Sequence, residues 1–156
     1  MSDQEQTKDE GLQAQVNGFV EKTISRSQRS FEIATAPPQP VGLSPKDVLY
    51  SRGTLRLYHY HSQADEVYRI PLLLVMATTN KAFVFDLAPG QSMIEFLLQR
   101  GFDIYVIDWA APGPDERGLT LKDYTQDFIP TCISKVQQDS GEDDINIIGY
   151  CMGGVL

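Results

Sequence analysis

The feature that most constrains this chain is a Gly-x-Cys-x-Gly motif at residues 149–153. It has the spacing of a nucleophile elbow, G-x-S-x-G, with cysteine in place of serine. Residues 145–148, Ile-Asn-Ile-Ile, are mostly apolar and β-branched, which is typical of a buried strand that leads into such a turn. The motif therefore predicts that Cys151 is a nucleophile at the end of a strand. The alternative is a structural cysteine that happens to lie between two glycines.

The residue types in the motif follow from the geometry of a sharp strand-to-helix turn. Neighbours two positions away from the nucleophile approach each other closely, so Gly149 and Gly153 remove the Cβ atoms that would collide. The turn also places the backbone N–H of Met152 at the start of a helix, where it can stabilise a developing oxyanion.

The bulk composition is that of one globular domain. The chain has 156 residues, of which 42% are hydrophobic and 22% charged. The net charge of −8 argues against nucleic acid and anionic membrane surfaces as partners. The polar, acidic start lacks a signal-peptide pattern, and the longest apolar run, 70–77, is too short to span a bilayer. Two cysteines are consistent with a reducing cytoplasm, and no cluster of metal ligands is present in the sequence.

The first forty residues differ from the rest. Residues 1–10 are expected to be disordered, and apolar residues at helical spacing predict an amphipathic helix over 11–33, or a segment that orders only on a partner. A Pro-rich linker at 37–40 follows. We therefore divide the chain into a segment 1–40 and a domain 41–156.

The domain is predicted to alternate strands and helices. Residues 48–61 read as a β-hairpin, and 72–76, 104–107 and 145–148 are apolar runs typical of a parallel sheet that is covered by helices. Capping boxes at Ser92/Glu95 and Thr120/Asp123 open two helices, and Pro130 should kink the second. One face of the second helix is predicted to carry Leu121, Tyr124, Phe128, Cys132 and Val136. The order hairpin, strand, helix, strand, helix, strand, elbow is that of the first half of an α/β-hydrolase sheet.

Four segments resemble one family, the polyhydroxyalkanoate synthases. Residues 80–92 are similar to their I-N-[RK]-x-Y-x-x-D-L-x-P-x-x-S stretch, 103–109 to D-V-Y-x-I-D-W, 121–124 to L-x-D-Y, and 149–154 to the lipase-like box G-x-C-x-G-G. The short N-terminal region is similar to the short-chain synthases, which work with a second subunit. Thr79 in place of isoleucine, and Ala110-Ala111 in place of a glycine, depart from the family pattern.

The resemblance implies an acyltransferase (EC 2.3.1) that polymerises 3-hydroxyacyl-CoA into polyhydroxyalkanoate and releases CoA. It implies a covalent thioester on Cys151, no cofactor, and a second oxyanion donor at the N–H of Thr79. A thiol suits this chemistry, because exchange of one thioester for another keeps the acyl group activated. The implied partners are the substrate and growing polyester, a second copy in a homodimer, a second synthase subunit, and the surface of cytoplasmic polymer granules.

The remaining triad groups are expected beyond the end of this sequence. In this fold the acid and the histidine follow the nucleophile, and only five residues follow Cys151. We therefore expect a fragment of a synthase that ends at the lipase-like box and is inactive alone. His59 and His61 precede the core and are expected to be ordinary hairpin residues, Asp108 to be structural, and Cys132 to pack in a helix face.

Two other functions remain open from the sequence. One is a cysteine hydrolase of the same fold that acts on small esters or lactones. The other is a non-catalytic binding subunit that keeps the elbow as a scaffold.

Overall fold

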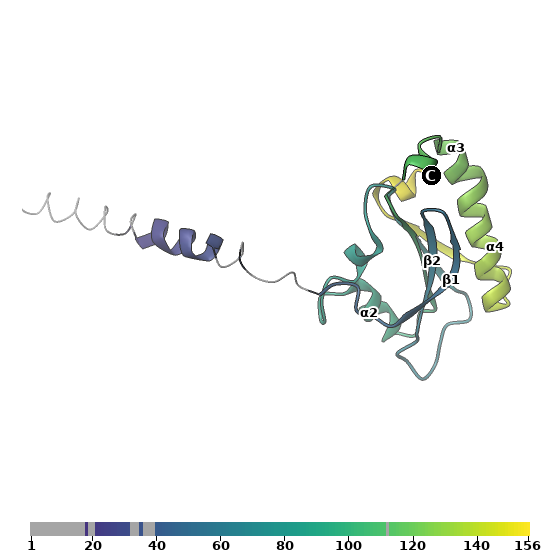
Figure 1. Cartoon of the computed structure of the whole chain (residues 1–156). Helices are drawn as coiled ribbons and strands as arrows, with labels where there is room; N and C mark the ends of the chain where they lie inside the picture. Colours follow the sequence, from purple (N-terminus) through teal and green to yellow (C-terminus); the bar gives the residue numbers. More distant parts are fainter. Residues whose placement is uncertain (1–17, 19–20, 32–34, 36–39, 112) are drawn as a thin grey trace, which may run out of the picture. The chain divides into compact units, whose positions relative to one another are not determined.

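A computed structural model describes residues 18, 21–31, 35, 40–111 and 113–156 (Figure 1). Pro40–Leu156 forms one compact unit, and the described residues before it belong to a separate unit. Residues 21–31 are helical with exposed side chains, and they lie within the stretch 11–33 for which a helix was predicted. The disorder predicted for 1–10 and most of the Pro-rich linker fall outside the described residues.

The compact unit is built on one mixed sheet with strand order β1-β2-β4-β3-β5. β1 pairs antiparallel with β2, and β2 antiparallel with β4. β3 lies parallel to both β4 and β5. The strands are β1 (Lys46–Arg52), β2 (Leu55–Tyr60), β3 (Leu72–Val75), β4 (Ile104–Trp109) and β5 (Asn146–Gly149). The predicted hairpin and the three predicted parallel strands are confirmed.

The hairpin turn depends on a glycine. Gly53 has φ +55°, a left-handed conformation that side chains with a Cβ rarely adopt. It joins β1 to β2, and the two strands stay in register except for an irregularity between Val48 and Tyr50. Such a bulge increases the local twist of the ribbon.

Helices cover both faces of the central strands β3 and β4. The connection from β3 to β4 carries α2 (Met93–Leu98), and that from β4 to β5 carries α4 (Ile129–Ser140). These two crossovers run in opposite directions across the sheet, so a common right-handed path places their helices on opposite faces. Figure 1 shows α2 and α4 on two sides of the strands. The central strands are accordingly buried, with all four residues of β3 inaccessible.

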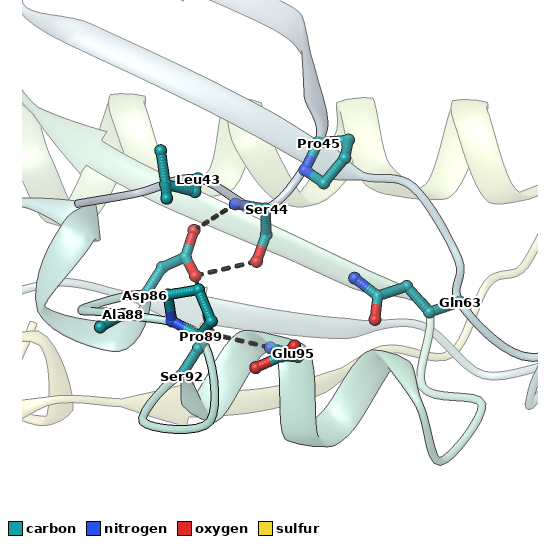
Figure 2. A pocket seen from close by; sticks show the side chains of 9 residues that line it. All are labelled: Leu43, Ser44, Pro45, Gln63, Asp86, Ala88, Pro89, Ser92 and Glu95. Carbon is teal, nitrogen blue, oxygen red and sulfur yellow. Dashed lines mark hydrogen bonds between the residues drawn. The ribbon is translucent and has the colours of Figure 1, made fainter. Parts of the chain in front are cut away.

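The start of α2 is fixed by a buried carboxylate. Asp86, 3% exposed, accepts hydrogen bonds from the N–H of Ser44 (2.8 Å), the hydroxyl of Ser44 (2.8 Å) and the hydroxyl of Ser92 (2.7 Å), as Figure 2 shows. Ser92 also accepts from the N–H of Glu95, which confirms the predicted N-cap. The carboxylate of Glu95 accepts from the N–H of Gly90.

The helix before β5 is irregular where proline was expected to disturb it. A short α3 (Leu121–Asp123) continues through a wider π-helical turn at 124–128 into α4, and Pro130 lies in the first turn of α4. A proline has no N–H to donate, and a π-turn accommodates it. Figure 1 labels both helices.

One face of this helical run packs on the sheet. Its buried side chains are Tyr124, Phe128, Cys132 and Val136, as predicted. Leu121 was predicted on the same face but is 64% exposed, because it opens the run before the first residue that reaches the core.

The exposure of β5 contradicts a second expectation. It was predicted to be buried, but its four residues are exposed, Ile147 by 51% and Ile148 by 40%. The reason is its place in the sheet: among the described strands it pairs only with β3 and forms the edge. Its apolar side chains therefore lack a covering layer in this part of the chain.

Candidate active site

The elbow follows directly from β5 at the carboxyl end of the parallel strands. The N–H of Tyr150 donates to the carbonyl of Val75 at 2.9 Å, which continues the pairing with β3. The chain then reverses at Cys151 and forms a 3₁₀ turn over Cys151–Gly154. Cys151 has φ +55°, and it is the one non-glycine residue with positive φ among those that the structure describes. This strained conformation is that of a nucleophile elbow.

The two glycines of the motif are required by close packing. A Cβ on Gly149 would lie 2.5 Å from the carbonyl oxygen of Gly153. A Cβ on Gly153 would collide with the carbonyl oxygen of Val75 and come within 2.9 Å of that of Met76. Backbone atoms cannot yield as a flexible side chain can, so the turn closes on itself only with glycine at 149 and fits against the end of β3 only with glycine at 153.

The two cysteines have opposite environments. Both are free thiols, with Cys151 exposed on the elbow and Cys132 fully buried in α4. Burial raises the pKa of the Cys132 thiol to about 12, because the thiolate would lose its hydration. Cys132 is therefore an inert core residue, as expected, and Cys151 is the thiol that a substrate can reach.

The predicted oxyanion donors, Met152 and Thr79, lie in two different turns of the chain. Met152 is the second residue of the turn that begins at Cys151, and the first N–H groups of a helical turn have no partner within it. Thr79 is exposed in the loop that leaves the carboxyl end of β3. That loop is tightened by a hydrogen bond from the N–H of Asn80 to the carbonyl of Ala77 at 3.1 Å. The assignment of both donors stays a prediction.

The end of β4 holds this loop in place. The indole N–H of Trp109 donates to the carbonyl of Met76 at 2.9 Å, and the ammonium of Lys81 donates to the carbonyl of Trp109 at 2.6 Å. The N–H of Ala82 donates to the carboxylate of Asp108 at 2.7 Å. We call residues 76–82 with Asp108 and Trp109 the loop brace. Asp108 thus has the structural role expected of it, and no pattern in the sequence predicted the contact of Lys81 with Trp109.

Neither histidine lies near Cys151. His59 pairs with Tyr105 in the β2–β4 register, near the amino end of the parallel strands, whereas Cys151 follows their carboxyl end. Its ring nitrogens contact the carboxylates of Asp103 (2.8 Å) and Asp139 (3.0 Å). His61 contacts the exposed carboxylate of Asp47. The structure therefore gives both histidines structural surroundings and brings neither to Cys151.

No group of three or more His, Cys, Asp and Glu side chains within the described residues is placed to hold a metal ion. No helix that the structure describes is long and apolar enough to cross a bilayer.

Comparison with known proteins agrees with this geometry. A family profile described as the alpha/beta hydrolase fold matches residues 84–156, and the strand order and elbow have that fold. A second profile, described as the N-terminus of poly-beta-hydroxybutyrate polymerase (PhaC), matches residues 10–97.

Individual relatives are also named as PhaC polymerases. The chain is 39% identical to the poly(3-hydroxyalkanoate) polymerase subunit PhaC of Haloferax mediterranei over 138 residues, 88% of this chain and 27% of that protein. It is 39% identical to that of Allochromatium vinosum over 117 residues, 74% of this chain and 33% of that protein. It is 28% identical to the subunit PhaC of Cupriavidus necator over 148 residues, which are 94% of this chain and 25% of that protein. The chain thus spans about a quarter to a third of the length of these relatives, and it belongs to the poly-beta-hydroxybutyrate polymerase (PhaC) family.

Proposed function

We propose that this chain carries the nucleophile of a polyhydroxyalkanoate synthase, and that Cys151 takes the acyl group of a 3-hydroxyacyl-CoA as a covalent thioester. The observation that supports this most directly is the exposed thiol of Cys151 at φ +55° on a two-glycine elbow. The names of the relatives supply the class of product, poly(3-hydroxyalkanoate), and the proposed substrate is the activated monomer of that polymer.

The proposed reaction has two transfers. The thiolate of Cys151 attacks the carbonyl carbon of the CoA thioester, a new carbon–sulfur bond forms, and the bond to CoA breaks. CoA leaves as a thiol and takes up the proton that Cys151 gave up. The hydroxyl oxygen of a second 3-hydroxyacyl group then attacks the acyl carbon, forms an ester and releases the Cys151 thiol.

The geometry around Cys151 suits the first transfer. The tetrahedral intermediate carries a negative oxygen, and the N–H groups of Met152 and Thr79 are the proposed donors to it. The loop brace sets the position of the second donor, because it ties residues 76–82 to the end of β4. Residues 1–156 alone are expected not to be acylated at a useful rate, because His59 and His61 lie away from Cys151.

The wider assembly follows the same proposal. A polyester product implies a granule surface in the cytoplasm as the working location, and the implied partners are a second copy of the chain and a second synthase subunit. No cofactor is needed, because the CoA thioester itself supplies the activated acyl group.

The test uses the whole protein that carries this chain. With 3-hydroxybutyryl-CoA, Cys151→Ala should abolish both CoA release and the increase in protein mass from acylation, while Cys132→Ala should retain both. Polymer formation by Cys151→Ala would refute the proposal. Release of free 3-hydroxybutyrate without polymer would identify a hydrolase, and no acylation of the wild type would identify a binding subunit.

A further inference from the structure

Tyr150 occupies the position of the elbow motif directly before Cys151, and the proposed mechanism does not use its side chain. Hydrogen bonds fix its backbone on both sides. Its N–H donates to the carbonyl of Val75, and its carbonyl accepts from the N–H of Gly153, both at 2.9 Å. The residue is 39% exposed, so burial in the core does not explain an aromatic side chain at this position.

The ring of Tyr150 contacts a buried aromatic side chain. It meets the ring of Phe85 edge to face, with 5.3 Å between the ring centroids and 77° between the ring planes. Phe85 is 5% exposed and is the last residue of the 3₁₀ helix η1 (Ala82–Phe85). Aromatic pairs favour this arrangement, because the positive edge of one ring lies against the negative face of the other. The side chain of Tyr150 is therefore tied to η1.

Carboxylates fix η1 at both ends. At its start, the N–H of Ala82 donates to the carboxylate of Asp108 at 2.7 Å. Directly after its end, the buried carboxylate of Asp86 accepts hydrogen bonds from Ser44 and Ser92 (Figure 2). A displacement of η1 would break these hydrogen bonds, so the helix offers the ring of Tyr150 a partner with a fixed position.

The two contacts of Tyr150 lie at the two ends of one segment. Its N–H binds Val75, where β3 ends, and its ring binds Phe85, where η1 ends. The stretch between these ends contains Thr79, whose N–H is the second proposed oxyanion donor. The first proposed donor, the N–H of Met152, lies just beyond Tyr150 in the elbow. Tyr150 thus joins the two segments that carry the donors.

We propose that Tyr150 is a positioning residue, whose ring and N–H hold residues 75–85 against the elbow and so set the separation of the two oxyanion donors. This role rests on the proposed function, in which both donors stabilise the tetrahedral intermediate. Donors that are placed in advance stabilise a developing charge best, because they need not reorganise during the reaction. A loosened donor therefore slows acylation and leaves ground-state binding of the substrate unchanged.

The experiment measures CoA release from 3-hydroxybutyryl-CoA by the whole protein that carries this chain. Tyr150→Leu removes the ring contact, so kcat should fall about tenfold, less than the roughly 10²–10³-fold cost of a lost donor, while KM stays within about twofold. Tyr150→Phe keeps the ring, so its kcat should stay within about twofold of the wild type. Phe85→Leu should reproduce the loss, and the double variant should be no slower than Tyr150→Leu, because both substitutions break the same contact.

Tyr68→Leu is the matched control. Tyr68 also belongs to an aromatic pair, with 5.0 Å between its ring centroid and that of Phe102, but this pair precedes β3 and β4 at the amino end of the parallel strands. Its loss should leave kcat unchanged. Equal kcat values for the wild type and Tyr150→Leu would overturn the proposal, as would a Tyr150→Phe variant as slow as Tyr150→Leu. A double variant in which the two single losses multiply would also overturn it.

Hydrogen exchange separates this role from the proposed function. Without substrate, the backbone amides of residues 76–85 should exchange faster in Tyr150→Leu than in the wild type, and exchange in Tyr68→Leu should be unchanged there. A wild type that is not acylated would remove the proposed function, and faster exchange in Tyr150→Leu would still support the bridge between the two segments. Unchanged exchange at 76–85 in Tyr150→Leu would overturn the bridge.

Discussion

His59 should make the stability of this fold fall as pH rises above neutrality. Its imidazole is held between two carboxylates from different elements, with Nε2 2.8 Å from Asp103 and Nδ1 3.0 Å from Asp139. The ring also stacks on Tyr105, with 4.1 Å between ring centroids. A protonated imidazole donates to both carboxylates, whereas a neutral one has a single N–H and presents a lone pair to the other carboxylate.

The sign and the size of the effect follow from this geometry. The hydrogen bond to Asp103, followed by the charges of Asp103 and Asp139, raises the pKa of His59 in the folded chain. The contribution is therefore fully present below the unfolded pKa of about 6.5, and is lost as pH rises through the folded pKa. A hydrogen bond to a charged group contributes about 1.5–3 kcal/mol, and exposed ion pairs about 0.2–1 kcal/mol. Because the His59 side chain is 35% exposed, we expect about 1–2 kcal/mol in all.

Urea unfolding between pH 6 and 9 measures this contribution. Trp109, the single tryptophan and 1% exposed, reports unfolding by fluorescence at low protein concentration. His59→Phe keeps the stacking on Tyr105 but cannot bind a proton. The difference in unfolding free energy between wild type and His59→Phe should shrink as pH rises, by no more than about 1.4 kcal/mol per pH unit.

The comparison of wild type with variant removes the other titrating groups from the result. His61→Phe is the matched control, because His61 also contacts a carboxylate but is 56% exposed, against 80% for its partner Asp47. The unfolding free energy of His61→Phe should still fall as pH rises, as that of the wild type does. A difference between wild type and His59→Phe that is constant from pH 6 to 9, or that grows, would refute the assignment of the protonated form to the folded chain.

Two further substitutions test the elbow and the loop brace. Gly153→Ala should cost about 2 kcal/mol or more, because its Cβ collides with the Val75 carbonyl of β3, while Gly118→Ala, with no atom within 4 Å, should change the unfolding free energy by less than about 0.5 kcal/mol. Equal costs in urea unfolding would contradict the packing argument. Trp109→Phe leaves the carbonyl of Met76 without its donor and should cost about 1–3 kcal/mol by circular dichroism. In Trp109→Phe the backbone amides of residues 76–82 should also exchange hydrogen faster than in the wild type. Unchanged exchange would argue against the loop brace.

Local patterns predicted the elements that depend on near neighbours. The hairpin, the three parallel strands and the cap at Ser92 were found because alternation, apolar runs and capping spacing act within a few residues. The elbow was found because its two glycines answer a steric need inside five residues. The exposure of β5 was missed, because the same β-branched sequence serves an edge or a central strand, and only the pairing distinguishes them.

The features that sequence could not predict join distant residues. His59 meets Asp103 across 44 positions and Asp139 across 80, and no local pattern signals either contact. The unpaired hydroxyl of Tyr60 is equally invisible in a strand whose tyrosines suit a half-buried sheet. Both features depend on side-chain direction within the folded sheet, which the sequence expresses only through the whole topology.

The position of Cys151 depends on three segments of the sequence together: the elbow and the ends of β3 and β4. β3 supplies the carbonyl of Val75, which accepts from the Tyr150 N–H and limits Gly153 to a residue without a Cβ. The next carbonyl, that of Met76, accepts from Trp109 at the end of β4. A shift of the loop brace would therefore move the carbonyls against which the elbow packs. A Gly-x-Cys-x-Gly segment grafted onto another strand would lack this support, so the motif positions the thiol of its cysteine only together with the ends of β3 and β4.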